Sequence, residues 1–146
     1  MKRIKKKLVI FLSILTLHVC FINAYADEDL YTVSGFVTGC SSKHSIHVTL
    51  YDEASFKDMT AIKESIYEPT ESEECKVPFT LNTSKGSYII AAFEDENNNK
   101  KLDFFFFIPK EPTGFFQKFI GMSAPKFENI KFDVDGDFVG ADVELQ

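Results

Sequence analysis

Oxygen-bearing side chains at alternating positions form the pattern in this sequence that is best suited to chemistry. Asp95, Asn97 and Asn99 are two residues apart, and Asp103 follows four residues later. A calcium ion takes about six to eight oxygen ligands from a short curved loop. The spacing matches positions 1, 3, 5 and 9 of an EF-hand-like loop. These four residues are therefore the candidate metal ligands, and Ca2+ is the candidate cofactor.

Two positions of this loop depart from the EF-hand pattern. Lys100 stands where such a loop has a glycine for its sharp turn, and Phe106 stands where it has a bidentate glutamate. The alternative interpretation is a polar turn between two strands, because Asn and Asp tolerate left-handed geometry and hydrogen-bond to their own backbone. The residues leave both interpretations open.

The same carboxylates allow a catalytic alternative. A hydrolase could use Asp95, Asp103 and Glu111, because paired carboxylates do acid–base work when burial separates their pKa values. His47 is expected on the polar face of a strand as a surface histidine, and no nucleophile-elbow motif accompanies it. We therefore expect a protein that is not an enzyme.

Phenylalanines crowd the segment that follows the polar loop. One block spans residues 104–107, and strand alternation predicts that two of its rings are buried and two are exposed. A second block follows between residues 115 and 120. The rings either pack in the core and at its rim or form an exposed apolar patch that docks a partner or a membrane surface. The candidate binding surface comprises Phe105, Phe107, Pro109, Lys110, Glu111, Phe115, Phe116 and Phe119.

Two cysteines, Cys40 and Cys75, follow the N-terminal segment. Their separation is far from a Cys-x-x-Cys motif, which disfavours a redox or metal pair. A structural disulfide is the favoured interpretation in an oxidising compartment. Two buried thiols or an intermolecular bridge are the alternatives.

The elements that must position these residues are mostly strands. Apolar residues alternate with polar ones along residues 31–37, 45–51, 77–81, 130–134 and 139–145, and residues 87–93 read as a central strand. Asp-Gly between the last two runs predicts a hairpin, and residues 53–74 are expected to form a loop-rich crossover with one helical turn. About seven short strands with little helix predict an all-β fold, a small antiparallel β-sandwich over residues 27–146.

The N-terminal segment differs from the rest of the chain. Residues 1–26 combine basic residues, an apolar run and Ala-x-Ala, which predicts a cleaved signal peptide. Neither this run nor a later one reaches the roughly 20 residues that a membrane-spanning helix needs. The remaining chain has 11 basic and 22 acidic residues, a net charge of −11 that disfavours nucleic-acid binding. We expect an acidic extracytoplasmic protein, either periplasmic or secreted.

Three motifs occur in order in the second half of the chain. They are Gly-x-Tyr at 86–88, Asp-Glu-Asn-x-Asn-x-x-Leu-Asp at 95–103 and Ile-Pro-Lys-Glu-x-x-Gly-Phe at 108–115. Together they resemble a family of secreted bacterial proteins known as domain of unknown function 2141, whose loop has a glycine in place of Lys100. The resemblance implies a β-sandwich of the transthyretin or carboxypeptidase-regulatory type, with no established activity.

The leading hypothesis is an extracytoplasmic, non-enzymatic β-sandwich module that binds another protein or an envelope component. Its binding surface is expected where residues 95–103 and 108–120 meet. A calcium-stabilised structural module and a hydrolase that uses the loop carboxylates are the alternatives.

Overall fold

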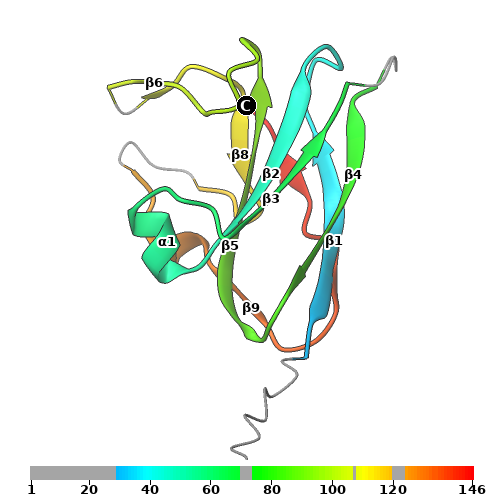
Figure 1. The fold of residues 1–146 in the computed structure, drawn as a ribbon, viewed down its shortest axis with the longest axis vertical. Helices are drawn as coiled ribbons and strands as arrows, with labels where there is room; N and C mark the ends of the chain where they lie inside the picture. The colour runs from blue at the N-terminus through cyan, green and yellow to red at the C-terminus, as the bar shows by residue number, and fades with distance from the viewer. Residues whose placement is uncertain (1–28, 70–73, 107, 120–123) are drawn as a thin grey trace, which may run out of the picture.

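The computed structural model describes residues 29–69, 74–106, 108–119 and 124–146, and in these residues the protein is all-β with two short helices. Figure 1 shows the arrangement of these elements. The elements are β1 (Tyr31–Thr38), β2 (Ser45–Tyr51), α1 (Glu53–Lys57), β3 (Lys63–Tyr67), β4 (Lys76–Thr83), β5 (Gly86–Asp95), β6 (Phe104–Phe105), β7 (Ile108–Pro109), β8 (Thr113–Phe115), α2 (Phe127–Ile130), β9 (Phe132–Val134), β10 (Phe138–Val139) and β11 (Val143–Glu144).

Two sheets form the body of the protein, and a separate hairpin projects from it (Figure 1). In the first sheet, β1 pairs antiparallel with β4 on one side and parallel with β10 and β11 on the other. In the second sheet the order is β3-β2-β5-β8, and β9 pairs with the first residues of β5. The short strands β6 and β7 pair only with each other among the described strands.

A shared apolar core joins the two sheets. Side chains that alternate along β1, such as Val33 and Val37, pack with Ile46 and Val48 of β2 and with Ile90 of β5. Burial of one side-chain face from each sheet is what drives two such layers together. A smaller apolar cluster lies under α1 and α2, which cover the second sheet. The strands that alternation predicted at residues 31–37, 45–51, 77–81 and 87–93 are confirmed as β1, β2, β4 and β5.

The helix α1 begins where the sequence provides a capping group. The backbone N–H of Ser55 donates to the side chain of Asp52 at 2.7 Å, and the Ser55 hydroxyl accepts from the backbone N–H of Asp52. This reciprocal arrangement satisfies two of the donors that a helix start leaves unpaired. The hydrogen bond that the Asp52 carboxylate accepts from the Ser55 backbone N–H lowers the pKa of this carboxyl. The helical turn expected in the crossover of residues 53–74 is present as α1. The edge strand β3, which follows α1 within the same crossover, was not predicted.

The C-terminal hairpin predicted around Asp135 and Gly136 is wrong. The strand before the turn, β9, joins the second sheet, whereas β10 and β11 after the turn run parallel to β1 in the first sheet. The backbone N–H groups of Thr32 and Phe36 donate to Asp137 and Asp142, at 2.8 and 2.9 Å, and hold this crossing in place. The expectation of a purely antiparallel fold is therefore also wrong at this edge.

The cysteines Cys40 and Cys75 lie at disulfide distance, with their Cα atoms 5.4 Å apart. They connect the end of β1 to the residue before β4, so the two strands that pair along their full length are also joined at one end. This agrees with the favoured interpretation of a structural pair rather than two separate thiols.

The predicted signal peptide, residues 1–26, lies outside the described residues. Within the described part of the chain, the structure has no helix with the length and apolarity to cross a membrane.

Candidate functional site

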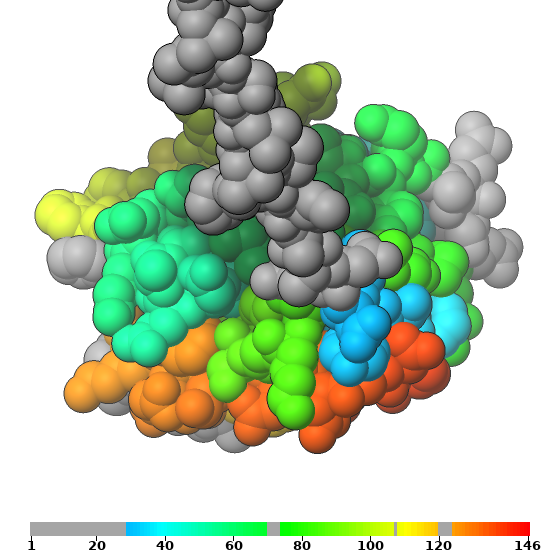
Figure 2. All heavy atoms as spheres, turned by 60° about the horizontal axis from the view of Figure 1, so that its bottom comes forward, coloured from blue at the N-terminus to red at the C-terminus, as the bar shows by residue number. Residues whose placement is uncertain are grey.

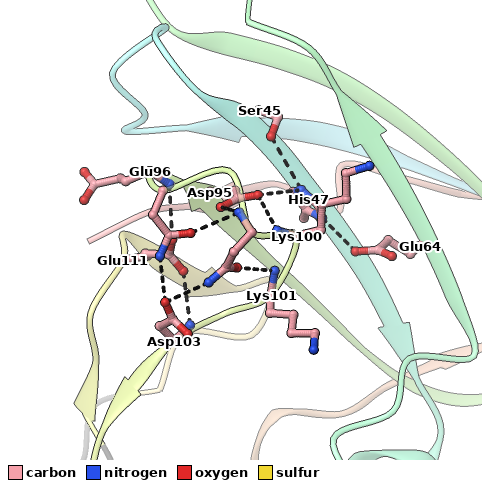
Figure 3. Close-up of polar contacts among 11 residues, drawn as sticks. Ser45, His47, Glu64, Asp95, Glu96, Lys100, Lys101, Asp103 and Glu111 are labelled. Atoms are coloured by element: carbon pink, nitrogen blue, oxygen red, sulfur yellow. Dashed lines mark hydrogen bonds and ion pairs between the residues drawn. The ribbon is translucent and has the colours of Figure 1, made fainter.

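Asp95 ends β5 and anchors the polar loop that follows. Its side chain is fully buried, and its two oxygens accept hydrogen bonds from the backbone N–H groups of Asn99 at 3.1 Å and Lys100 at 2.7 Å (Figure 3). A carboxylate at the first loop position thus organises the turn by binding the backbone five residues later. Lys100 has a φ of 63°, in the left-handed region that favours glycine.

The two asparagines link the middle of the loop to its far end. The side-chain amides of Asn97 and Asn99 both donate to Asp103 Oδ2, at 2.7 and 2.9 Å. Their own Oδ1 atoms accept from backbone N–H groups, Asn97 from that of Asn99 and Asn99 from that of Lys101. The structure therefore brings together the four residues that the sequence singled out, with N–H groups facing their oxygens.

Glu111 closes the base of the loop. It is 5 % exposed, and its two oxygens accept from the backbone N–H groups of Glu96 at 3.2 Å and Asp103 at 3.1 Å. The backbone N–H of Lys110 donates in turn to the carbonyl of Asp103 at 2.9 Å. We call Asp95, Asp103 and Glu111, with Asn97 and Asn99, the carboxylate network. It fixes the points at which the loop leaves β5 and the chain returns toward β8.

His47 is buried beside this network, so its interpretation as a surface histidine is wrong. It is 1 % exposed; its Nδ1 lies 2.7 Å from Glu64 Oε1, and its Nε2 lies 3.6 Å from Asp95 Oδ2. The pairing register places Asp95 opposite Ser45 and Phe93 opposite His47, so that the Phe93 and His47 rings stack 4.6 Å apart. The sequence could not reveal this contact, because it depends on the register between β2 and β5.

The same histidine invites comparison with a catalytic triad. Ser45 Oγ lies 3.5 Å from His47 Nε2, and Glu64 holds Nδ1. In a working triad the imidazole nitrogen must take a proton from the nucleophile. Here the Asp95 carboxylate lies on the same side of the ring, and the imidazole is enclosed. We interpret His47 as an internal link between β2, β3 and the loop.

A third buried carboxylate, that of Glu94, was not expected from the sequence. Glu94 is 1 % exposed, and its oxygens accept from the backbone N–H of Ser41 at 2.9 Å and from the Ser41 hydroxyl. This contact ties the end of β5 to the segment between β1 and β2, next to Cys40. The apolar pattern ends at Phe93 and therefore places Glu94 and Asp95 in the polar segment, whereas in the structure β5 continues through both residues.

The aromatic hairpin, which we define as residues 104–106, 108 and 109, extends from this network. It comprises β6, β7 and Phe106, and it stands out from the side of the molecule (Figures 1 and 2). Phe104, Phe105 and Phe106 are 45 %, 62 % and 81 % exposed, and Ile108 is 69 % exposed. The prediction that alternation buries two of the four phenylalanines is therefore wrong, because β6 has no second layer to pack against. Phe107 lies outside the described residues.

The second aromatic block points inward instead. Phe116 packs edge-on against Phe132 and Phe138, with ring centroids 5.2 and 5.5 Å apart, and joins the main core. Phe115 and Phe119 pack against the smaller core cluster. Gly114, between β5 and β11, has no room for a side chain, because a Cβ atom there would collide with the carbonyl oxygen of Glu144. Of the described rings in the predicted binding surface, that of Phe105 is exposed, and the prediction that Glu111 belongs to this surface is wrong because its side chain is buried.

We expect calcium to leave the melting temperature unchanged. Each oxygen of Asp95 and Glu111 already accepts a backbone N–H, and among the described residues no group of three His, Cys, Asp or Glu side chains is placed to hold a metal ion. A ligand that binds only the native state must raise the melting temperature. The measurement is a thermal melt in EDTA and in millimolar calcium. A rise that Asp103→Ala abolishes would support the calcium-stabilised alternative and contradict our interpretation of the loop as a turn.

Replacing Lys100 by glycine is expected to stabilise the protein. The φ of 63° at Lys100 is disfavoured for a residue with a Cβ atom, and glycine removes that cost of about 1 kcal/mol. Urea unfolding should show an increase of that size in the free energy of unfolding. Lys101→Gly is the matched control, because no positive φ occurs there and the substitution should be neutral or destabilising. An equal effect of both substitutions would contradict the strain assigned to Lys100.

Comparison with known proteins gives one match. The family model described as "Uncharacterized protein conserved in bacteria (DUF2141)" matches residues 37–139, which include the carboxylate network and the aromatic hairpin. No curated protein and no solved structure matches the chain.

Proposed function

The chain belongs to the bacterial family of uncharacterised proteins described by DUF2141, and on that premise we propose that it is a non-enzymatic binding module. It works outside the cytoplasm, as a periplasmic or secreted protein, after removal of residues 1–26. Its two packed sheets form a β-sandwich of the transthyretin or carboxypeptidase-regulatory type. The partner is an envelope component or another protein, bound through the aromatic hairpin.

One observation carries this proposal. Three consecutive phenylalanines and an isoleucine of the aromatic hairpin face solvent, although burial of such rings is among the most favourable terms in folding. A contiguous exposed apolar patch on a soluble protein marks a contact site. The hairpin has no internal partner that accounts for its composition among the described strands.

The carboxylate network supports a contact role for this hairpin. Asp103 lies directly before the hairpin and Glu111 lies two residues after it, and Glu111 accepts a hydrogen bond from the Asp103 backbone N–H. A fixed base lowers the conformational entropy that the hairpin loses on binding, and so favours binding. The same hydrogen bonds favour a structural role over hydrolysis, because the oxygens of Asp95 and Glu111 face N–H donors rather than an open site.

The extracytoplasmic location rests on two observations. Basic residues, an apolar run and Ala-x-Ala occur in order in residues 1–26. Cys40 and Cys75 lie at disulfide distance, and disulfides persist in oxidising compartments.

Photo-crosslinking in living bacteria tests the contact surface. Benzoylphenylalanine replaces Phe106 in one variant and Val139 of β10 in the control, and the two sites are similarly exposed, at 81 % and 84 %. We expect irradiation to give one defined adduct at position 106 and none at position 139. Mass spectrometry then identifies the adduct as a protein or a lipid. No adduct at position 106, or equal adducts at both positions, would contradict the proposal.

A further inference from the structure

We infer that the partner of the aromatic hairpin is a lipid bilayer with anionic headgroups. This inference rests on the proposed function and specifies its partner. Phe105, Phe106 and Ile108 enter the boundary between headgroups and acyl chains. Lys100, Lys101 and Lys110 contact the headgroup phosphates.

The shape of the patch favours a bilayer over a protein. The exposed fractions of Phe104, Phe105 and Phe106 correspond to roughly 400 Å² of apolar surface at about 200 Å² per ring. A standard protein–protein interface buries about 450 Å² of apolar surface on each partner, so the area of the patch fits either kind of partner and its shape has to decide. A convex tip also touches a flat protein surface on one side only, whereas a fluid bilayer surrounds it and covers all of its exposed rings.

The charges near the hairpin suit an anionic surface. Lys100, Lys101 and Lys110 are exposed, and in the described part of the chain their ammonium groups make no ion pair. By contrast, Lys57, Lys118 and Lys131 each pair with a glutamate. Basic residues beside exposed apolar ones are typical of proteins that lie on anionic membranes.

The negative charge of the rest of the protein favours one orientation of the protein on an anionic bilayer. The chain from residue 27 onward carries a net charge of −11, so most of its surface is repelled by anionic lipids. Near the hairpin, Asp95 and Glu111 are buried and hydrogen-bonded, which leaves the three lysines to face outward together with Glu96 and the half-buried Asp103. The protein therefore approaches the bilayer with the hairpin first.

The backbone at the tip of the hairpin holds an exposed ring in a conformation that is unfavourable for phenylalanine. Phe106 has a φ of 58° and is 81 % exposed. A bulky residue in this conformation is disfavoured, and glycine or asparagine is the usual choice for such a turn. The Phe106 ring is largely exposed and so adds little to the stability of the fold, whereas contact with a bilayer would bury it.

Sedimentation with lipid vesicles tests the inference. The protein is purified after processing by the bacterium that secretes it, and its N-terminus is determined by mass spectrometry for every variant. The vesicles contain either phosphatidylcholine alone or phosphatidylcholine mixed with phosphatidylglycerol. We expect the wild type to partition onto the mixed vesicles, and Phe105→Ser/Phe106→Gly to lower the partition coefficient by at least about tenfold.

Two further variants keep the result specific. Leu30→Ser/Val139→Ser removes two exposed apolar side chains outside the hairpin, one directly before β1 and one in β10. This control variant should bind like the wild type. Lys100→Gln/Lys101→Gln/Lys110→Gln should lower binding to the mixed vesicles by about fivefold or more and leave binding to phosphatidylcholine unchanged. Because Phe106→Gly relieves a positive φ, the hairpin variant should melt no lower than the wild type.

The outcomes separate the inference from the proposed function. A wild type that sediments with neither vesicle, or a hairpin variant that binds as well as the wild type, overturns the lipid inference. If residue 106 then still crosslinks to a protein in cells, the binding module stands with a protein as its partner. If residue 106 gives no adduct either, both proposals fail.

Discussion

Replacement of Asp95 by alanine should lower the free energy of unfolding by about 2–4 kcal/mol. The buried Asp95 carboxylate accepts two backbone N–H groups of the loop and faces His47. Alanine removes the only acceptor that the structure shows for the Lys100 N–H and one of the two acceptors of the Asn99 N–H, and it leaves a gap beside the buried His47. The cost of an unmade buried hydrogen bond exceeds the net gain of making one. Urea unfolding followed by circular dichroism measures the change.

Asp103→Ala is the matched control for this substitution. Asp103 is half-buried, and its side chain accepts from the two asparagine amides rather than from the backbone. Both amides can turn to water after the substitution, so the loss should stay below about 1 kcal/mol. Equal losses for the two variants would show that the loop is held by its charge rather than by the buried backbone contacts of Asp95.

Replacement of both Cys40 and Cys75 by serine should lower the free energy of unfolding by about 3–4 kcal/mol, because the cross-link closes a long chain segment in the unfolded state. The sequence separation of the pair is 35 residues. Urea unfolding of the double variant and the wild type measures the difference.

A reductant provides the control for this prediction. Dithiothreitol should lower the stability of the wild type to that of the double variant and leave the double variant unchanged. If the reductant has no effect on the wild type, the two cysteines are thiols in solution, and the oxidising location loses one of its two supports.

The main strands follow from alternation, because both sheets bury one face against the same core. The pattern of Val33, Gly35 and Val37 predicts the buried face of β1, and the structure buries all three. The fully apolar run at residues 88–90 likewise predicts the centre of β5. Period-two alternation reports burial on one face, so it identifies strands that lie on a core and carries no information about their neighbours.

Strand pairing and the burial of polar side chains were harder to predict, because both depend on which strands are neighbours. The separation of β9 from β10 depends on hydrogen bonds from Thr32 and Phe36 to distant aspartates. The burial of His47 depends on the register that brings Phe93 and Asp95 beside it. Neither relation is local in sequence. The hydrogen bonds within residues 95–103, by contrast, join residues at most six positions apart, and the sequence therefore indicates this loop.

The aromatic block shows where alternation misleads. Phe104 and Phe105 form a true strand, β6, yet both rings are exposed. Alternation assumes that one face of a strand meets a second layer, and this two-stranded hairpin meets none among the described elements. An apolar run in an isolated hairpin therefore predicts a contact surface rather than a core.

Amide hydrogen exchange over the whole chain is the most direct test of the central claim, that the aromatic hairpin is the contact surface. The exchange of each segment is compared with and without envelope membranes from the bacterium that produces the protein. The account predicts slower exchange at residues 104–109 and unchanged exchange at the edge strands β3 and β10. Unchanged exchange in the hairpin, with protection at another surface, would contradict it.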